Sequence, residues 1–78
     1  MGYSAKLTQS QADVISGEIY ANNPDAQFGI GEGKSVTSTR ATFQYNVATE
    51  EATLYSNYTH DNVINEIPEG FRPLFTKY

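Results

Sequence analysis

The sequence predicts an all-β fold, a small antiparallel sheet or sandwich built on hairpins, with room for one short helical turn near the N-terminus. Two observations support this prediction. Between Arg40 and Pro73, apolar residues recur at every second position over two successive segments, which is the period of a half-buried strand. Short clusters of Gly, Pro, Asn and Asp separate the apolar segments, and these residue types are typical of turns.

The first 23 residues are the least determined part of the chain. Residues 1–10 are polar except at alternate positions, which predicts a short edge strand or an arm. Residues 10–23 fit a helix capped by Ser10, with Asp13 three residues later. They also fit a strand, and Gly17 costs a helix about 1 kcal/mol relative to Ala. The two alternatives stay open for residues 10–17, and we prefer one helical turn followed by a strand over residues 18–22.

The clearest element is a hairpin with strands at residues 41–47 and 52–59, joined by a polar turn at residues 48–51. Its alternation predicts a register in which Tyr45 faces Leu54 on the buried side and Gln44 faces Tyr55 on the outer side. A slip by one residue would expose the apolar set of the second strand. We expect the core to consist of the large apolar side chains of this hairpin and its neighbours: Ile19, Phe28, Phe43, Tyr45, Leu54, Tyr58 and Ile67.

The remaining segments predict shorter strands and turns. Residues 63–67 are predicted to form a short strand. Residues 67–70 fit a type I turn, with Pro68 second and Gly70 fourth. Residues 74–78 could form one more strand.

The length of 78 residues predicts one small domain spanning residues 1–78, or a fragment or protomer of a larger β assembly. The chain has no cysteine and no cluster of residues with metal-ligand spacing, so we expect neither a metal nor a cofactor. A thin core without such cross-links favours a homo-oligomer. The candidate interface residues are aromatic: Tyr20, Phe71, Phe75 and Tyr78.

Composition also argues against several classes of function. Nine acidic residues against five scattered basic ones give a net charge of −4, which disfavours nucleic-acid binding. No apolar run is long enough for a membrane span, and we see no signal peptide. The glycines at residues 29–33 precede Lys34 and Ser35 with the wrong spacing for a phosphate-binding loop. His60 is the only histidine, and no serine lies in a nucleophile motif, so we do not expect an enzyme.

Two segments resemble parts of bacteriophage tail and fibre proteins. Residues 17–33, which begin Gly-Glu-Ile-Tyr-Ala-Asn and end Gly-Ile-Gly-Glu-Gly, resemble a hairpin that recurs in fibre shafts. Residues 67–73, Ile-Pro-Glu-Gly-Phe-Arg-Pro, are similar to a turn between two strands in distal fibre domains. The resemblance implies a virion structural or adhesion module, typically a homotrimer and sometimes with a saccharide site between subunits.

The outer face of the hairpin is the candidate binding surface. A tyrosine surrounded by amide and hydroxyl side chains suits a saccharide, and the residues proposed for binding are Gln44, Tyr55, Asn57 and Arg72. The alternative function is a small acidic inhibitor, encoded by a phage or bacterium and located in the cytoplasm, which acts by binding a target protein. An ordinary solvated sheet face explains the same outer residues without any ligand.

Overall fold

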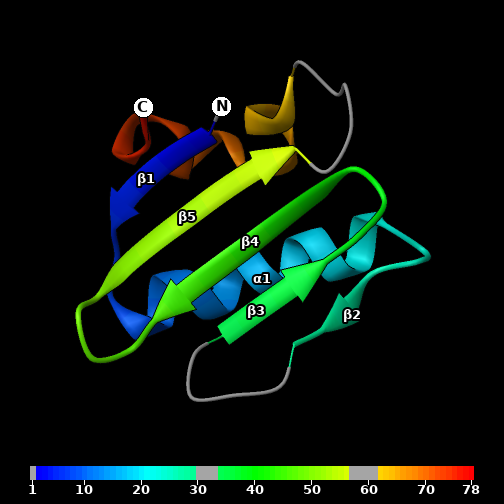
Figure 1. Cartoon of the computed structure of the whole chain (residues 1–78), viewed down its shortest axis with the longest axis horizontal. Coiled ribbons are helices and arrows are strands. Elements are labelled where there is room, and N and C mark those ends of the chain that lie inside the picture. The colour runs from blue at the N-terminus through cyan, green and yellow to red at the C-terminus, as the bar shows by residue number, and fades with distance from the viewer. Residues whose placement is uncertain (1, 30–33, 57–61) are drawn as a thin grey trace.

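The computed structural model describes residues 2–29, 34–56 and 62–78, whose strands form one six-stranded antiparallel sheet with an α-helix behind it (Figure 1). In chain order the described elements are β1 (Gly2–Lys6), α1 (Gln9–Asn22), β2 (Gln27–Phe28), β3 (Lys34–Thr37), β4 (Ala41–Asn46), β5 (Glu51–Ser56), the 3-10 helices η1 (Val63–Glu66) and η2 (Glu69–Leu74), and β6 (Thr76–Lys77). The strand order across the sheet is β2-β3-β4-β5-β1-β6. The expected antiparallel sheet is confirmed, but the fold is mixed α and β, so the all-β prediction is wrong.

The difference comes mainly from α1, a full helix where one turn and a strand were expected. Thr8, not Ser10, caps its N-terminus: the Thr8 hydroxyl accepts from the Gln11 backbone N–H at 3.2 Å, and the Gln11 side chain accepts from the Thr8 N–H at 2.9 Å. This capping box stabilises the first turn. The helix buries one stripe against the sheet, formed by Ala12, Ile15, Ser16 and Ile19. Burial of this stripe outweighs the cost of Gly17 in the middle of the helix.

The hairpin β4–β5 forms with the predicted faces and a different register. Tyr45 lies opposite Ala52 and Phe43 opposite Leu54, a shift of two residues from the predicted pairing. A shift by an even number leaves each side chain on its predicted face. The shift arises because the turn begins at Asn46, whose side-chain Oδ1 accepts from the N–H groups of the two residues that follow Val47, at 2.9 and 3.2 Å.

The last residue of this turn, Glu50, has a φ of 58°. This left-handed conformation is unusual for a residue other than glycine. The Glu50 N–H donates to the Asn46 carbonyl at 2.8 Å, and the Glu50 carbonyl accepts from the Leu7 N–H at 3.0 Å. These two backbone hydrogen bonds fix the turn against the segment between β1 and α1.

After β5, the described residues are mostly helical rather than extended. The predicted strand at residues 63–67 is the 3-10 helix η1, and the predicted turn at residues 67–70 leads directly into η2. The predicted C-terminal strand is confirmed over β6, which pairs with β1. The two segments that resemble fibre proteins therefore differ from the expected hairpin and strand-flanked turn: residues 17–22 lie in α1, and residues 69–73 lie in η2.

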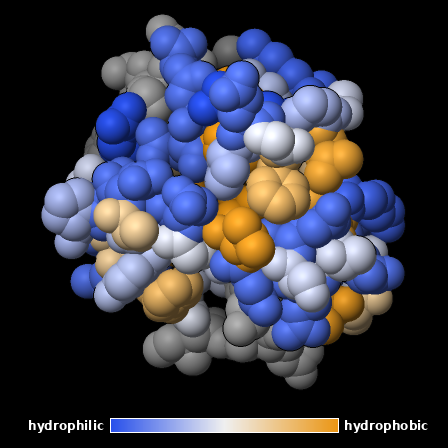
Figure 2. All heavy atoms as spheres, turned by 180° about the vertical axis from the view of Figure 1, so that it is seen from behind, coloured by the Kyte–Doolittle hydropathy of each residue, from blue (hydrophilic) through white to orange (hydrophobic). Residues whose placement is uncertain are grey.

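The sheet has one buried face, which packs against α1, η1 and η2 as a single core. Of the seven core residues predicted, Ile19, Phe43, Tyr45, Leu54 and Ile67 are buried, Phe28 is not, and Tyr58 lies outside the described residues. From the helical side, apolar side chains gather near the middle of the molecule among hydrophilic ones (Figure 2). The opposite face of the sheet, here called the outer face, is turned toward the viewer in Figure 1, and no described helical element covers it.

Candidate binding surface on the outer face of the sheet

The outer face is ordered into rows of residues that lie opposite one another on neighbouring strands. The central row crosses five strands, from β3 to β6, and every member has a hydroxyl or amide side chain. Its members are Ser35, Gln44, Thr53, Ser4 and Thr76. Gln44 and Thr76 are exposed, and the other three are half-buried. Neighbouring strands lie about 4.8 Å apart, so the central row extends about 19 Å.

An aromatic row lies on one side of the central row. In it Thr42 faces Tyr55, and Tyr55 faces Gly2 across β5 and β1. The Tyr78 N–H donates to the Gly2 carbonyl at 3.0 Å, which places Tyr78 beside Gly2 on the other side from Tyr55. A Cβ at Gly2 would lie 2.7 Å from the Tyr78 hydroxyl and 2.8 Å from the Leu54 carbonyl oxygen, so only glycine leaves room for this arrangement. The hydroxyl end of the Tyr78 ring thus takes the place of a side chain at position 2, one strand away from Tyr55.

A charged row lies on the other side of the central row. Lys6 faces Glu51, and the Lys6 Nζ lies 3.6 Å from the Glu51 carboxylate. The same Nζ donates to the Thr49 carbonyl at 3.1 Å. Both side chains are exposed, so the ion pair contributes little to stability. Its main consequence is that the two charges on this side of the face cancel.

A shallow, open depression lies where the central and charged rows meet β6. Its lining residues are Ser4, Ala5, Lys6, Glu51, Leu74 and Thr76. The lining combines polar and charged side chains with the apolar Ala5 and Leu74, and most of its exposed surface is apolar. The depression therefore extends the central row toward the edge of the sheet.

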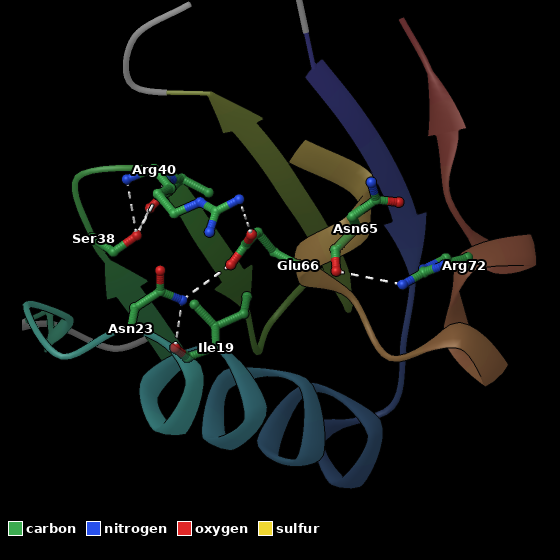
Figure 3. Close-up of polar contacts among 8 residues, drawn as sticks. Ile19, Asn23, Ser38, Arg40, Asn65, Glu66 and Arg72 are labelled. Atoms are coloured by element: carbon green, nitrogen blue, oxygen red, sulfur yellow. Dashed lines mark hydrogen bonds and ion pairs between the residues drawn. The ribbon is translucent and has the colours of Figure 1, made fainter. Parts of the chain in front are cut away.

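The structure brings together only part of the predicted binding set. Gln44 and Tyr55 share the outer face, although Gln44 faces Thr53 and not Tyr55. Arg72 lies in the helical layer, where its Nε donates to the Ile67 carbonyl at 2.9 Å and its Nη2 to the Asn65 carbonyl at 3.4 Å (Figure 3 shows the second contact). Asn57 lies outside the described residues.

Sequence reasoning missed the contribution of the two chain ends to this surface. Ser4 and Thr76 complete the central row because β1 lies between β5 and β6, and local patterns do not predict such long-range order. The available signal was the alternation of residues 2–7, which places Tyr3, Ala5 and Leu7 on the opposite face to Ser4.

The four predicted interface residues lie in different environments. Tyr20 is 48% exposed, and its ring stacks on Phe28 with a centroid distance of 4.6 Å. Phe71 is half-buried against the core. Phe75 is 8% exposed and belongs to the core, so it offers little surface to a partner. Tyr78 is 66% exposed and lies beside the outer face.

A separate polar cluster connects three elements on the helical side of the molecule (Figure 3). Asn23, just after α1, donates to the Ile19 carbonyl at 2.8 Å and to the Glu66 carboxylate at 3.0 Å. Arg40, in the β3–β4 turn, forms an ion pair with the same carboxylate at 3.4 Å. The Ser38 hydroxyl accepts from the Arg40 N–H at 3.1 Å and closes this turn. Each member has a structural partner, so we assign the cluster to stability.

Two further polar contacts shift side-chain pKa values. Asp25 accepts a hydrogen bond from the Thr39 N–H at 2.6 Å, and this bond lowers the pKa of the Asp25 carboxyl. The buried Tyr45 hydroxyl donates to the Leu7 carbonyl at 2.7 Å. Burial raises the pKa of Tyr45, and the negative charges of Glu50 and Asp13 raise it further. Both contacts are structural, and neither lies on the outer face.

Comparisons with protein-family models, curated proteins and solved structures find no match to this chain. Within residues 2–29, 34–56 and 62–78, no group of three or more His, Cys, Asp or Glu side chains is placed to hold a metal ion. No helix in the part of the chain that the structure describes is both long and apolar enough to cross a membrane.

Proposed function

We propose that this protein is a non-enzymatic adhesion module that contacts a cell surface through the outer face of its sheet. The observation that carries the proposal is the central row: hydrogen-bonding, uncharged side chains extend across five strands on a face that no described helix covers. A face built this way can form many hydrogen bonds with a polar ligand without desolvating a charge.

The proposal includes a place in a virion of the phage type, as part of a homotrimer. Its support is the sequence likeness of residues 17–33 and 67–73 to tail and fibre proteins, and this likeness lies in the sequence alone, because residues 17–22 form part of α1 and residues 69–73 part of η2. The partly exposed apolar side chains of the helical layer, which include Tyr20, Ile64 and Phe71, offer the surface for assembly. Because these side chains lie on the helical side, a trimer formed there leaves the outer face free for adhesion.

A second candidate function is a small acidic inhibitor that acts in the cytoplasm by binding a target protein. The observation that favours it is the closed core of the single chain, in which Phe43, Leu54 and Ile67 are fully buried and even Phe75 is covered. Such a chain can be stable as a monomer. Its net charge of −4 suits a basic target surface.

The test of adhesion is binding of the labelled protein to a panel of intact bacterial cells. The double variant Gln44→Arg with Thr76→Arg places two long cations at exposed positions of the central row. The matched control, Gln9→Arg with Asn22→Arg, makes the same change of charge at exposed positions of α1. We expect saturable binding by the wild type and the control, and loss of binding by the central-row variant.

Equal binding by both variants would overturn the role of the outer face. Absence of saturable binding to every cell type in the panel would overturn adhesion itself. A tight, stoichiometric complex with a soluble protein in place of cell binding would favour the inhibitor.

A further inference from the structure

We infer that the ligand of the outer face is a neutral oligosaccharide that lies across the strands, along the central row. This inference rests on the proposed adhesion function and adds the chemical class and the orientation of the ligand. The supporting observations are the charge of the face, the donors and acceptors of the row, and the tyrosines beside it.

The charge of the outer face disfavours a charged ligand. The central row carries no ionisable side chain, and in the row beside it Lys6 is paired with Glu51. Binding to a nucleic acid or a sulfated glycan depends on several unpaired Lys or Arg side chains that neutralise the anionic groups. This face lacks that feature in the part of the chain that the structure describes.

The side chains of the central row match the hydroxyl groups of a sugar. A serine or threonine hydroxyl donates one hydrogen bond and accepts others, and the Gln44 amide offers both donors and an acceptor. Sugar hydroxyls have the same dual capacity. The row extends about 19 Å across the strands, so its groups span several linked sugar rings rather than one.

The tyrosines provide an apolar complement. The faces of sugar rings carry C–H groups, which pack on aromatic rings, while the tyrosine hydroxyl stays available for a hydrogen bond. Tyr55 is half-buried in the sheet surface, and Tyr78 is largely exposed beside it. The hydroxyl end of the Tyr78 ring occupies the space above Gly2, which faces Tyr55 on the neighbouring strand. A ligand on the central row therefore has aromatic rings along one side.

A protein partner fits this surface less well. The centre of a protein interface usually relies on a few aromatic or arginine anchors that fill pockets, and Ser and Thr are under-represented among them. Here Ser and Thr occupy the centre, and the tyrosines lie to one side. The depression lined by Ser4, Leu74 and Thr76 is open and shallow rather than a closed pocket that could hold such an anchor. These features favour a polar chain that lies flat on the sheet.

The test is a titration of the full-length ¹⁵N-labelled protein with neutral hexasaccharides, namely cellohexaose, maltohexaose and chitohexaose. A heparin hexasaccharide is the charged comparator. We expect at least one neutral compound to shift the amide resonances of Ser4, Gln44, Thr53 and Thr76. Loss of one hydrogen bond in Gln44→Ala should weaken the Kd about three- to tenfold. The control Gln9→Ala, at an exposed position of α1, should leave the Kd unchanged.

Three outcomes would overturn the inference: no shift at millimolar neutral sugar, shifts confined to residues outside the outer face, or equal binding of the heparin compound. The failure of this inference is separable from the failure of adhesion. If cell binding depends on the central row but is abolished by protease treatment of the cells and survives periodate, the ligand is a protein and adhesion stands. Loss on periodate treatment alone supports the oligosaccharide.

Discussion

The side-chain amide of Asn23 donates hydrogen bonds to both the Ile19 carbonyl and the Glu66 carboxylate, at 2.8 and 3.0 Å. One residue thereby closes the last turn of α1 and connects it to η1. The Glu66 side chain is only 8% exposed, and its second partner is Arg40. A carboxylate so well buried depends on its hydrogen bonds, because an unsatisfied buried group is costly.

The first prediction is that Asn23→Ala lowers the free energy of unfolding by about 1–3 kcal/mol, since it removes two hydrogen bonds and leaves the Glu66 carboxylate with one fewer donor. Urea denaturation measures the change. Asn22→Ala is the matched control, because Asn22 is exposed and should change stability by less than about 0.5 kcal/mol. Equal effects of the two substitutions would show that the Asn23–Glu66 hydrogen bond is unimportant.

The second prediction contrasts two phenylalanines that the sequence alone could not distinguish. Phe43 is fully buried between β4 and the helical layer, so Phe43→Ala should cost about 3–5 kcal/mol. Phe28 is 54% exposed on the short strand β2, so Phe28→Ala should cost less than about 1.5 kcal/mol, mostly from its stacking on Tyr20. Chemical denaturation of both variants measures these costs. A larger loss for Phe28→Ala would contradict the burial that we describe.

These residues also show how far local patterns predict the fold. Alternation placed Phe43, Tyr45 and Leu54 on the buried face because a half-buried strand has a period of two. It could not fix the register, which depends on the Asn46 side chain and the left-handed Glu50. Nor could it predict α1, whose stability comes from burying Ala12, Ile15 and Ile19 on a sheet formed by distant residues.

The candidate site was predictable to a similar extent. Gln44 and Tyr55 were placed on the outer face because that requires only the alternation within one hairpin. Ser4 and Thr76 were missed because their positions depend on the order β5-β1-β6, which is a tertiary property. Arg72 was misjudged because residues 69–74 form a 3-10 helix that turns the side chain toward backbone carbonyls.

The third prediction concerns backbone strain at Glu50. Its φ of 58° costs a residue with a Cβ about 1 kcal/mol or more, whereas glycine adopts it freely. Glu50→Gly should therefore raise the free energy of unfolding by up to about 1 kcal/mol. Thr49→Gly, one residue earlier, should lower it by about 0.5–1 kcal/mol, because there glycine only adds conformational freedom to the unfolded chain. Thermal melts measure both changes. If the two substitutions shift the melting temperature in the same direction, strain at Glu50 is ruled out.

The fourth prediction is a loss of stability at alkaline pH that depends on Tyr45. Burial raises the pKa of Tyr45 above the ordinary tyrosine value of about 10, so the folded state holds this proton more tightly than the unfolded state. The stability that comes from holding this proton is fully present below about pH 10. It is lost as the pH rises through the pKa of Tyr45 in the folded state. Urea midpoints measured from about pH 8 to pH 11.5 should fall.

Tyr45→Phe is the control for this pH dependence. It removes the ionisable hydroxyl, and with it the hydrogen bond to the Leu7 carbonyl. We expect lower stability than the wild type at neutral pH and a shallower decline at alkaline pH. A decline as steep as that of the wild type would assign the alkaline effect to other groups.

The last prediction tests assembly through the helical side. Tyr20 and Phe28 form a stacked pair, each about half exposed. Phe28 belongs to the edge strand β2, and an edge strand can pair with a neighbouring chain. We expect the mass measured by light scattering to be that of a homotrimer, with a melting temperature that rises with protein concentration. Tyr20→Ser should lower the mass toward that of the monomer, because it removes an apolar contact that the fold of a single chain leaves half exposed. Gln44→Ser, on the outer face, should leave the mass unchanged. A monomeric wild type at high micromolar concentration, with a melting temperature independent of concentration, would contradict the trimer and favour the monomeric inhibitor.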